Sequence, residues 1–162
     1  MQKLPLADEI TALSPRLGQF ADWEMPLFFS SAANEHQAVR EKAGLFDISH
    51  MGQIFCEGPE AEIFLNQQLT NDVSKLKSGR SHYSFLLNEN GGVIDDLLLY
   101  RLSQDRFFIV FNASRVKQAL ALLDPKATAS NLSLTQRLDH VCLLYTSPSP
   151  RDQRGSRMPS SA

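Results

Sequence analysis

The sequence predicts an α+β fold in which an antiparallel sheet is built from hairpins and covered by helices. Three observations lead to this prediction. Asn90-Gly91 separates two apolar runs, which is the strongest short signal of a β-hairpin. A third apolar run, 106–113, follows after a short polar turn. Segments with helical spacing lie before and after these runs, so strands joined by hairpins are accompanied by helices.

Length and composition indicate a globular protein. A chain of 162 residues ordinarily forms one domain that buries roughly two thirds of its unfolded surface. The net charge of -2 and the lack of a basic cluster argue against a nucleic-acid partner. No apolar run approaches the ~20 residues of a membrane span, and no signal peptide is visible, so we expect a cytoplasmic protein without a membrane partner. Cys56 and Cys142 fit neither a disulfide framework nor a paired metal motif; no metal site is expected, and Cys56 should be a buried thiol.

The first helix is predicted between Ser30 or Ser31, as N-cap, and Gly44, as the stop signal. Two short strands, 45–49 and 51–58, should follow it. A second helix is expected from Pro59, which suits a first helical turn, to about Thr70. Its apolar stripe is expected to contain Ile63, Phe64 and Leu69.

The hairpin pairs Tyr83–Leu87 with Val93–Leu102, and both central turn residues should have positive φ. The third strand, 106–113, precedes a helix capped by Ser114 and ended by Pro125. Its apolar residues recur at helical spacing: Val116, Ala119, Leu120 and Leu123. A last strand is expected at 131–138.

Two adjacent acids, Asp95 and Asp96, begin the second hairpin strand. Side chains alternate along a strand, so the two acids should point to opposite faces. The face of Asp96 also carries Ile94, Leu98, Tyr100 and Leu102. At least one carboxylate therefore lies against a hydrophobic surface, where its pKa tends to rise. The alternative is that both carboxylates are exposed to solvent at the open end of the hairpin.

From Cys142 onward the sequence loses its periodic apolar pattern and is rich in Ser, Pro and Arg. We expect residues 142–162 to form a disordered tail. This tail resembles a peptide translated from sequencing-adapter DNA, and a genuine Ser/Pro-rich linker is the alternative. Residues 1–141 would then be a truncated portion of a longer natural protein.

Several segments together resemble one family, the glycine cleavage system T protein, an aminomethyltransferase. They are, in chain order, "FADWEMPLFF", "EHQAVREKAGLFDISHMGQI", "LTNDV", "NENGGVIDDLLLYRL" and "FFIVFNAS". The pair "LFDISHMG" and "GGVIDDLLLY" is highly specific when both occur in one chain. The resemblance implies that residues 1–141 are the N-terminal part of the folate-binding domain in a three-domain fold.

The resemblance also implies a reaction. Aminomethyl carried on the lipoyl arm of H protein passes to tetrahydrofolate, which gives methylenetetrahydrofolate, ammonia and the reduced lipoyl group. Tetrahydrofolate is thus the implied cofactor and lipoylated H protein the implied partner. The chain alone is expected to be inactive, since folate contacts from later domains are missing.

Matching to the family assigns Asp96 the catalytic role, in which its carboxylate stabilises positive charge developing on the folate. By the same matching, the other implied folate contacts are Met51, Tyr83, Val110 and Asn112. Leu98 and Tyr100 share the strand face of Asp96 and would add an apolar wall for a flat ring, with the Tyr100 hydroxyl as a polar group. Asp95 is expected to have a structural or solvated role. Two other functions remain open at this point: a folate-dependent demethylase of the same fold, and a folate-binding protein that is not a transferase. A non-functional fragment is a further possibility.

Overall fold

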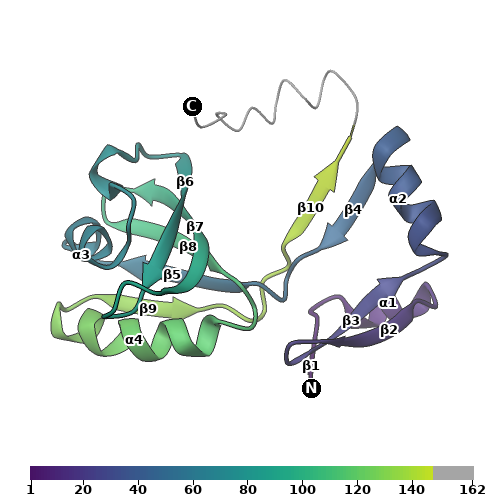
Figure 1. The fold of residues 1–162 in the computed structure, drawn as a ribbon, viewed down its shortest axis with the longest axis horizontal. Coiled ribbons are helices and arrows are strands. Elements are labelled where there is room, and N and C mark those ends of the chain that lie inside the picture. The colour runs from purple at the N-terminus through teal and green to yellow at the C-terminus, as the bar shows by residue number, and fades with distance from the viewer. Residues whose placement is uncertain (148–162) are drawn as a thin grey trace. The chain divides into compact units, whose positions relative to one another are not determined.

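The structure is a computed structural model that describes residues 1–147. The chain divides into two compact units, drawn in Figure 1. Unit 1 contains residues 1–49 and the described residues from 141 onward, and unit 2 contains His50–His140. Both units contain paired strands and short helices.

Unit 1 begins with a small three-stranded sheet in the order β1-β3-β2. Its elements are β1 (Gln2–Lys3), α1 (Ala7–Ala12), β2 (Arg16–Phe20) and β3 (Trp23–Phe28). β2 and β3 are antiparallel, whereas β1 joins β3 in parallel. Trp23 lies in this sheet with only 6% of its surface exposed, so the indole contributes to the core of the unit.

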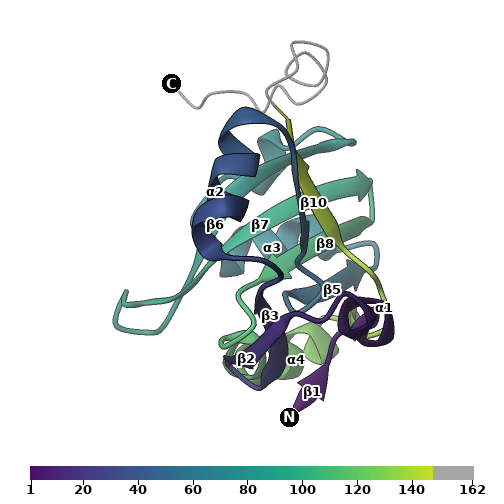
Figure 2. The same ribbon diagram turned by 90° about the vertical axis from the view of Figure 1, so that its right-hand side faces the viewer.

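The first predicted helix is α2 (Ala32–Glu41) in unit 1. Ser31 is its N-cap, because the Ser31 side chain accepts a hydrogen bond from the Asn34 N–H at 3.2 Å. The helix ends before Gly44, which is instead the first residue of β4 (Gly44–Asp47). Figure 2 shows α2 together with β4 and the strand that pairs with it.

That partner strand is β10 (Leu143–Thr146), which pairs with β4 in antiparallel register. β10 lies within residues 142–162, which were expected to form a disordered tail. That expectation does not hold for Leu143–Thr146, which form a strand. The pairing uses main-chain groups, and Leu143–Thr146 contains no proline, so each of its residues has both a main-chain donor and an acceptor. It is continued by the Ile48 N–H, which donates to the Cys142 carbonyl at 2.9 Å. The rest of the expected tail, 148–162, lies outside the described residues.

Unit 2 is built on a five-stranded antiparallel sheet in the order β6-β7-β8-β5-β9. The strands are β5 (Gly52–Glu57), β6 (Arg80–Leu87), β7 (Val93–Ser103), β8 (Arg106–Phe111) and β9 (Ser133–Gln136). Two helices accompany them, α3 (Ala61–Gln68) and α4 (Val116–Ala129), with a 3-10 turn, η1 (Val73–Lys75). The predicted α+β class with antiparallel pairing is confirmed.

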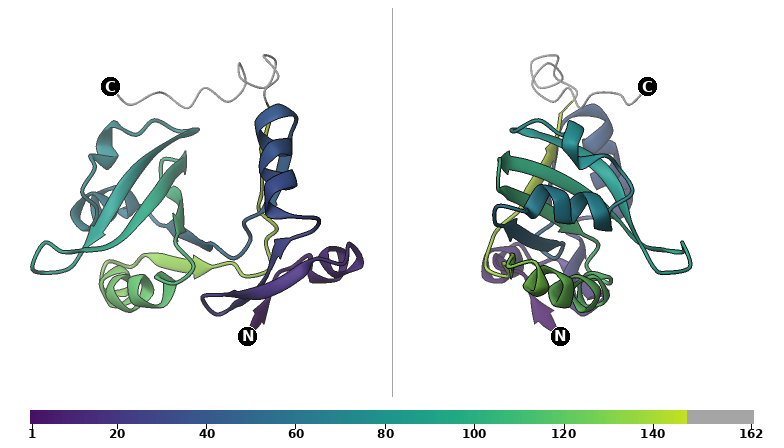
Figure 3. Two further views of the ribbon diagram at one scale, coloured as in Figure 1. Left: turned by 45° about the vertical axis from the view of Figure 1, so that its right-hand side comes forward. Right: turned by 90° about the vertical axis from the view of Figure 1, so that its left-hand side faces the viewer.

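Both helices lie on one face of this sheet (Figure 3, right). They bury Ala61, Phe64 and Leu65 from α3 and Val116, Ala119, Leu123 and Ala127 from α4 against the sheet. Ile63 is 60% exposed, so its placement in the apolar stripe is wrong. Ala61, Phe64 and Leu65 follow the i, i+3, i+4 spacing of one helix face, and Ile63 falls outside it. Cys56 is fully buried, as predicted.

The hairpin between β6 and β7 has a longer turn than expected. Only Gly91 has positive φ, at 79°, so the prediction of two central residues with positive φ is wrong. The Asn88 side chain explains the difference, because its Oδ1 accepts hydrogen bonds from the N–H groups of Asn90 and Gly92, each at 2.9 Å. Asn88 thereby organises a wider loop, as Asx turns do.

α4 differs from the prediction at both ends. Arg115, and not Ser114, is its N-cap, and Pro125 lies inside the helix. A proline removes one main-chain donor, and the helix continues past it to Ala129, with Ala127, two residues after the proline, buried in the core. Asn131 ends the segment with φ of 54°, a left-handed conformation that asparagine tolerates.

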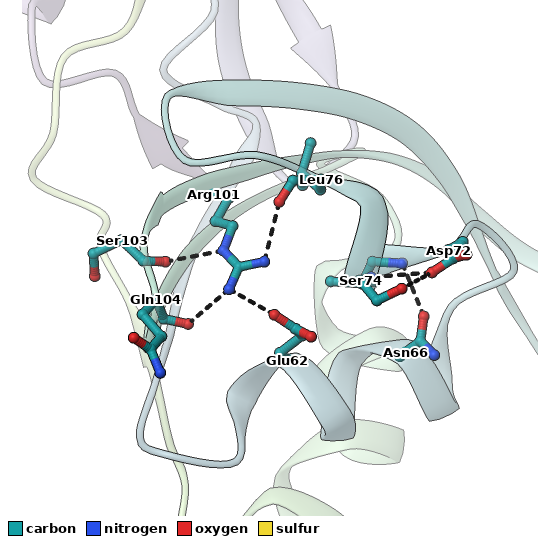
Figure 4. A network of polar contacts seen from close by, with 9 residues as sticks. Glu62, Asn66, Asp72, Ser74, Leu76, Arg101, Ser103 and Gln104 are labelled. Atoms are coloured by element: carbon teal, nitrogen blue, oxygen red, sulfur yellow. Dashed lines mark hydrogen bonds and ion pairs between the residues drawn. The ribbon is translucent and has the colours of Figure 1, made fainter.

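The far end of β7 is fixed by the Arg101 guanidinium, shown in Figure 4. It donates to the carbonyl oxygens of Leu76, Ser103 and Gln104 at 3.1, 3.3 and 3.4 Å. It also forms an ion pair of 2.6 Å with Glu62 of α3. No helix within residues 1–147 is both long enough and apolar enough to cross a lipid bilayer.

Candidate functional site

The sheet of unit 2 has a second face, opposite α3 and α4. Alternation along the strands separates the two faces, because Leu97 and Leu99 of β7 and Ile109 of β8 are buried in the core. Their neighbours therefore point to the second face. The predicted site residues found on it are Tyr83 from β6, Asp96, Leu98 and Tyr100 from β7, and Val110 from β8.

Strand register places these residues in adjacent rows. Leu98 pairs with Tyr83 on one side and with Val110 on the other. Tyr100 begins the next row and pairs with Phe108, with ring centroids 5.7 Å apart. Phe55 of β5 continues that row at 5.0 Å from Phe108. Aromatic and aliphatic side chains thus form a continuous apolar surface across four strands.

Ile94 does not belong to this surface, although alternation predicted it there. Ile94 is 9% exposed and packs in the core cluster. The cause is a register shift in the hairpin, where Asp95 pairs with Leu86 but Leu87 pairs with Val93. Such a bulge places one extra residue in β7 and breaks the alternation at that point.

Asp96 lies at the polar end of the same face and is exposed. Asn112, directly after β8, connects to it: the Asn112 Nδ2 donates to Asp96 Oδ1 and to the Asp96 carbonyl oxygen, each at 3.1 Å. Strand register would set Asn112 opposite Asp96, one pair beyond Leu98 and Val110. The Asp96 carboxylate and the Asn112 amide are therefore hydrogen-bonded to each other at one edge of the apolar surface.

Asp95 is the acid that lies against the core, with 4% of its surface exposed. Its Oδ2 accepts the Asn112 N–H at 2.9 Å, and its Oδ1 accepts the Asn112 Nδ2 at 2.8 Å. Burial raises the pKa of Asp95, and the hydrogen bonds from Asn112 oppose this rise. A solvated Asp95 is therefore ruled out, and of the two expected roles the structural one remains.

Met51 is half-buried and immediately precedes β5, whose first residue, Gly52, pairs with Phe111 of β8. Continuing this register brings Met51 alongside Asn112. Alternation from Gln53 sets the Met51 side chain on the second face of the sheet. All seven predicted site residues thus belong to one face or to its immediate edge.

The contact between Asp95 and Asn112 was not predicted from the sequence. The position of Asp95 in alternation with Leu97 and Leu99 was a usable signal of burial, because both are core residues. The partner, Asn112, lies 17 residues away and gave no such signal.

The arrangement suits a flat ligand with a polar edge. The apolar surface offers stacking and dispersion contacts, while the Asp96 carboxylate and the Asn112 amide offer hydrogen bonds at one end. The Asn112 amide carries both donors and an acceptor. Within residues 1–147, no group of three or more His, Cys, Asp or Glu side chains is arranged to hold a metal ion.

Comparison with known families gives a match to the GCVT N-terminal domain over residues 6–147. Curated proteins named aminomethyltransferase are similar in sequence. That of Halalkalibacterium halodurans is 42% identical over 127 residues, which are 78% of this chain and 35% of the relative. That of Exiguobacterium sibiricum is 46% identical over 118 residues, which are 73% of this chain and 32% of the relative.

A solved structure is similar as well: the glycine cleavage system aminomethyltransferase T from Bartonella henselae. It superposes with a TM-score of 0.86 at 40% identity, over 91% of this chain and 41% of that chain. The chain described here spans about a third of the length of the curated relatives it matches.

Proposed function

This chain belongs to the GCVT N-terminal domain family, and on that premise we propose that it is the folate-binding N-terminal portion of a tetrahydrofolate-dependent aminomethyltransferase of the glycine cleavage system. The observation that carries the proposal is the gathering of Asp96, Asn112 and the apolar residues around Leu98 on one face of a single sheet. Similar proteins named aminomethyltransferase support it.

The residues of this face fit a reduced pterin. A pterin is flat and carries several nitrogen donors and acceptors along its edge. Leu98, Tyr100 and Val110 would contact the ring faces, and Tyr83 would extend that contact from β6. Asn112 and Asp96 would meet the polar edge, with Met51 closing the side near β5.

Tetrahydrofolate supplies the acceptor nitrogens for the one-carbon unit when it is bound. The role of this chain is then positioning and electrostatics. The Asp96 carboxylate, held by the Asn112 amide, stabilises positive charge that develops on the reacting nitrogens. The hydrogen bond fixes the carboxylate before the reaction, so no reorganisation is needed as charge develops.

The same proposal includes lipoylated H protein as the partner that delivers the aminomethyl group, and ammonia as a product. The chain alone is proposed to be inactive. We also propose a cytoplasmic location. Both cysteines, Cys56 and Cys142, are free thiols, which suits a reducing compartment.

The proposal is tested by replacing the residue that matches Asp96 in a full-length relative with Asn. Folding should be retained, because Asp96 is exposed. Folate-dependent ammonia release from aminomethylated H protein should fall about 100- to 1,000-fold, the usual effect of removing one electrostatic contact to a transition state. A substitution at the position that matches Asp105, which lies in the exposed turn after β7, is the control and should leave turnover unchanged.

An unchanged rate in the Asp96→Asn variant would reject the catalytic assignment. A relative that binds 5-formyltetrahydrofolate but releases no ammonia from aminomethylated H protein would identify the non-transferase alternative. Activity on a methylated amine in place of aminomethylated H protein would identify the demethylase alternative.

A further inference from the structure

The two adjacent acids of β7 converge on a single amide. The Asn112 Nδ2 lies 2.8 Å from Asp95 Oδ1 and 3.1 Å from Asp96 Oδ1. The same nitrogen lies 3.1 Å from the Asp96 carbonyl oxygen. Two N–H groups thus serve three acceptors, so at least one hydrogen bond is shared between two oxygens.

The two acids differ in burial. Asp95 is 4% exposed, whereas Asp96 is exposed on the ligand-facing side of the sheet. A buried carboxylate needs hydrogen bonds to offset its lost hydration. Asp95 obtains two of them from one residue, through the N–H and the Nδ2 of Asn112. Asn112 is therefore held at two points by one buried side chain.

This double contact fixes the orientation of the Asn112 amide. If the amide were turned by 180°, its oxygen would face two carboxylates and a carbonyl, all of which are acceptors. With the nitrogen directed to these acceptors, the amide oxygen is directed away from them. Asn112 then presents an acceptor, and not a donor, beside the Asp96 carboxylate.

We infer that Asp95 is a positioning residue that acts through Asn112: it holds the amide so that the Asn112 oxygen and the Asp96 carboxylate form a pair of acceptors for a ligand with neighbouring N–H groups. The inference rests on the proposed function and deepens it, because it states which edge of a reduced pterin this end of the sheet recognises.

The inference is tested first without any ligand. In this chain, the side-chain amide signals of Asn112 are identified in a nitrogen-15 NMR spectrum by their loss in Asn112→Ala. Asp95→Asn replaces one acceptor oxygen by an NH₂ group and should shift these signals and speed their exchange with water. Asp105→Asn is the control and should leave them in place. Unchanged Asn112 side-chain signals in Asp95→Asn would overturn the inference.

The second test is a double-mutant cycle on binding of 5-formyltetrahydrofolate, a stable reduced folate, followed by calorimetry. Asp95→Asn should weaken binding about tenfold, which corresponds to one charge-assisted hydrogen bond. In the Asn112→Ala background the same change should have no further effect, because the group it positions is absent. Losses that add in the double variant would overturn the inference.

The outcomes separate the two proposals. Failure of the unsubstituted chain to bind 5-formyltetrahydrofolate counts against the proposed function, while the amide signals still decide the link between Asp95 and Asn112. If Asp95→Asn does not fold, Asp95→Ser takes its place, since serine keeps an acceptor for the Asn112 N–H but leaves the amide without its carboxylate.

Discussion

The Arg101 guanidinium is predicted to contribute strongly to the stability of unit 2. The Arg101 side chain is 12% exposed and reaches from β7 to α3 and to the segment after η1. The substitution Arg101→Met removes the guanidinium and keeps a long apolar side chain that packs against the Phe107 ring, over which the guanidinium now lies at 5.3 Å. The change therefore isolates the polar contacts from the packing.

The expected loss of unfolding free energy follows from how exposed each partner of the guanidinium is. The Leu76 carbonyl is partly buried and loses its donor, which costs about 1–3 kcal/mol. The carbonyls of Ser103 and Gln104 lie in an exposed turn, where water replaces the donor and the loss is about 0.5 kcal/mol each. Glu62 is 35% exposed, so the ion pair contributes up to about 1 kcal/mol. The sum is about 3 kcal/mol.

Hydrogen exchange of main-chain amides in β7 and β8 measures this loss, and unit 1 serves as an internal reference. A loss of about 3 kcal/mol speeds exchange of the core amides by about 100-fold when it proceeds through unfolding of the unit. Exchange in unit 1 should not change, because Arg101 belongs to unit 2.

Arg106→Met is the matched control. Arg106 also forms an ion pair, with Glu57 at 2.7 Å, and also lies over a ring, that of Phe55 at 5.0 Å. It is 53% exposed, so its substitution should cost no more than about 1 kcal/mol. Equal losses in the two variants would refute the reasoning, because burial would then not determine the contribution of the guanidinium.

Three further predictions concern other sites in unit 2. Gly52→Ala should destabilise the unit by about 1–3 kcal/mol in a urea titration, because the added Cβ would overlap Val116 Cγ2 of α4; wild-type stability would contradict the close packing there. Cys56, whose pKa burial raises to about 12, should resist alkylation at about pH 8 in the folded chain and react after unfolding, as mass spectrometry detects. Labelling of the folded chain at Cys56 would refute its burial. Asp95 has a pKa raised by burial, so its stabilising contribution is complete below the ordinary value of 3.8 and is lost as pH rises through the raised value. Wild-type chain should therefore lose stability relative to Asp95→Asn as pH rises through this window, and a constant difference between the two would contradict the raised pKa.

The sequence predicts the strands of unit 2 well because each is a short apolar run with a clear boundary. The β6–β7 pairing and the order of β7 and β8 followed from the hairpin signal and a polar turn. What the sequence did not show is how side chains far apart change local geometry. Asn88 widens the hairpin loop, and the bulge opposite Leu87 turns Ile94 into the core.

In the candidate site, too, the sequence predicted which residues share a strand face but did not predict the long-range contacts. Alternation placed Asp96, Leu98 and Tyr100 on one face, and the strand register agrees with this. Alternation put Asp95 on the strand face of Leu97 and Leu99, but its role depends on a contact with Asn112 that forms only when β8 pairs with β7. Long-range hydrogen bonds of this kind leave no periodic signal in the sequence. β10 is a similar case, since its partner β4 lies about a hundred residues earlier and the pairing is made by main-chain groups.

The central claim is that the second face of the unit 2 sheet binds a reduced folate. An NMR titration of this chain with 5-formyltetrahydrofolate tests it directly. The account predicts that main-chain amide signals of Tyr83, Leu98, Tyr100 and Val110 move with added ligand, while signals of α3 around Phe64 stay in place. Signals that move only on the α3 and α4 side, or no movement at all, would contradict it.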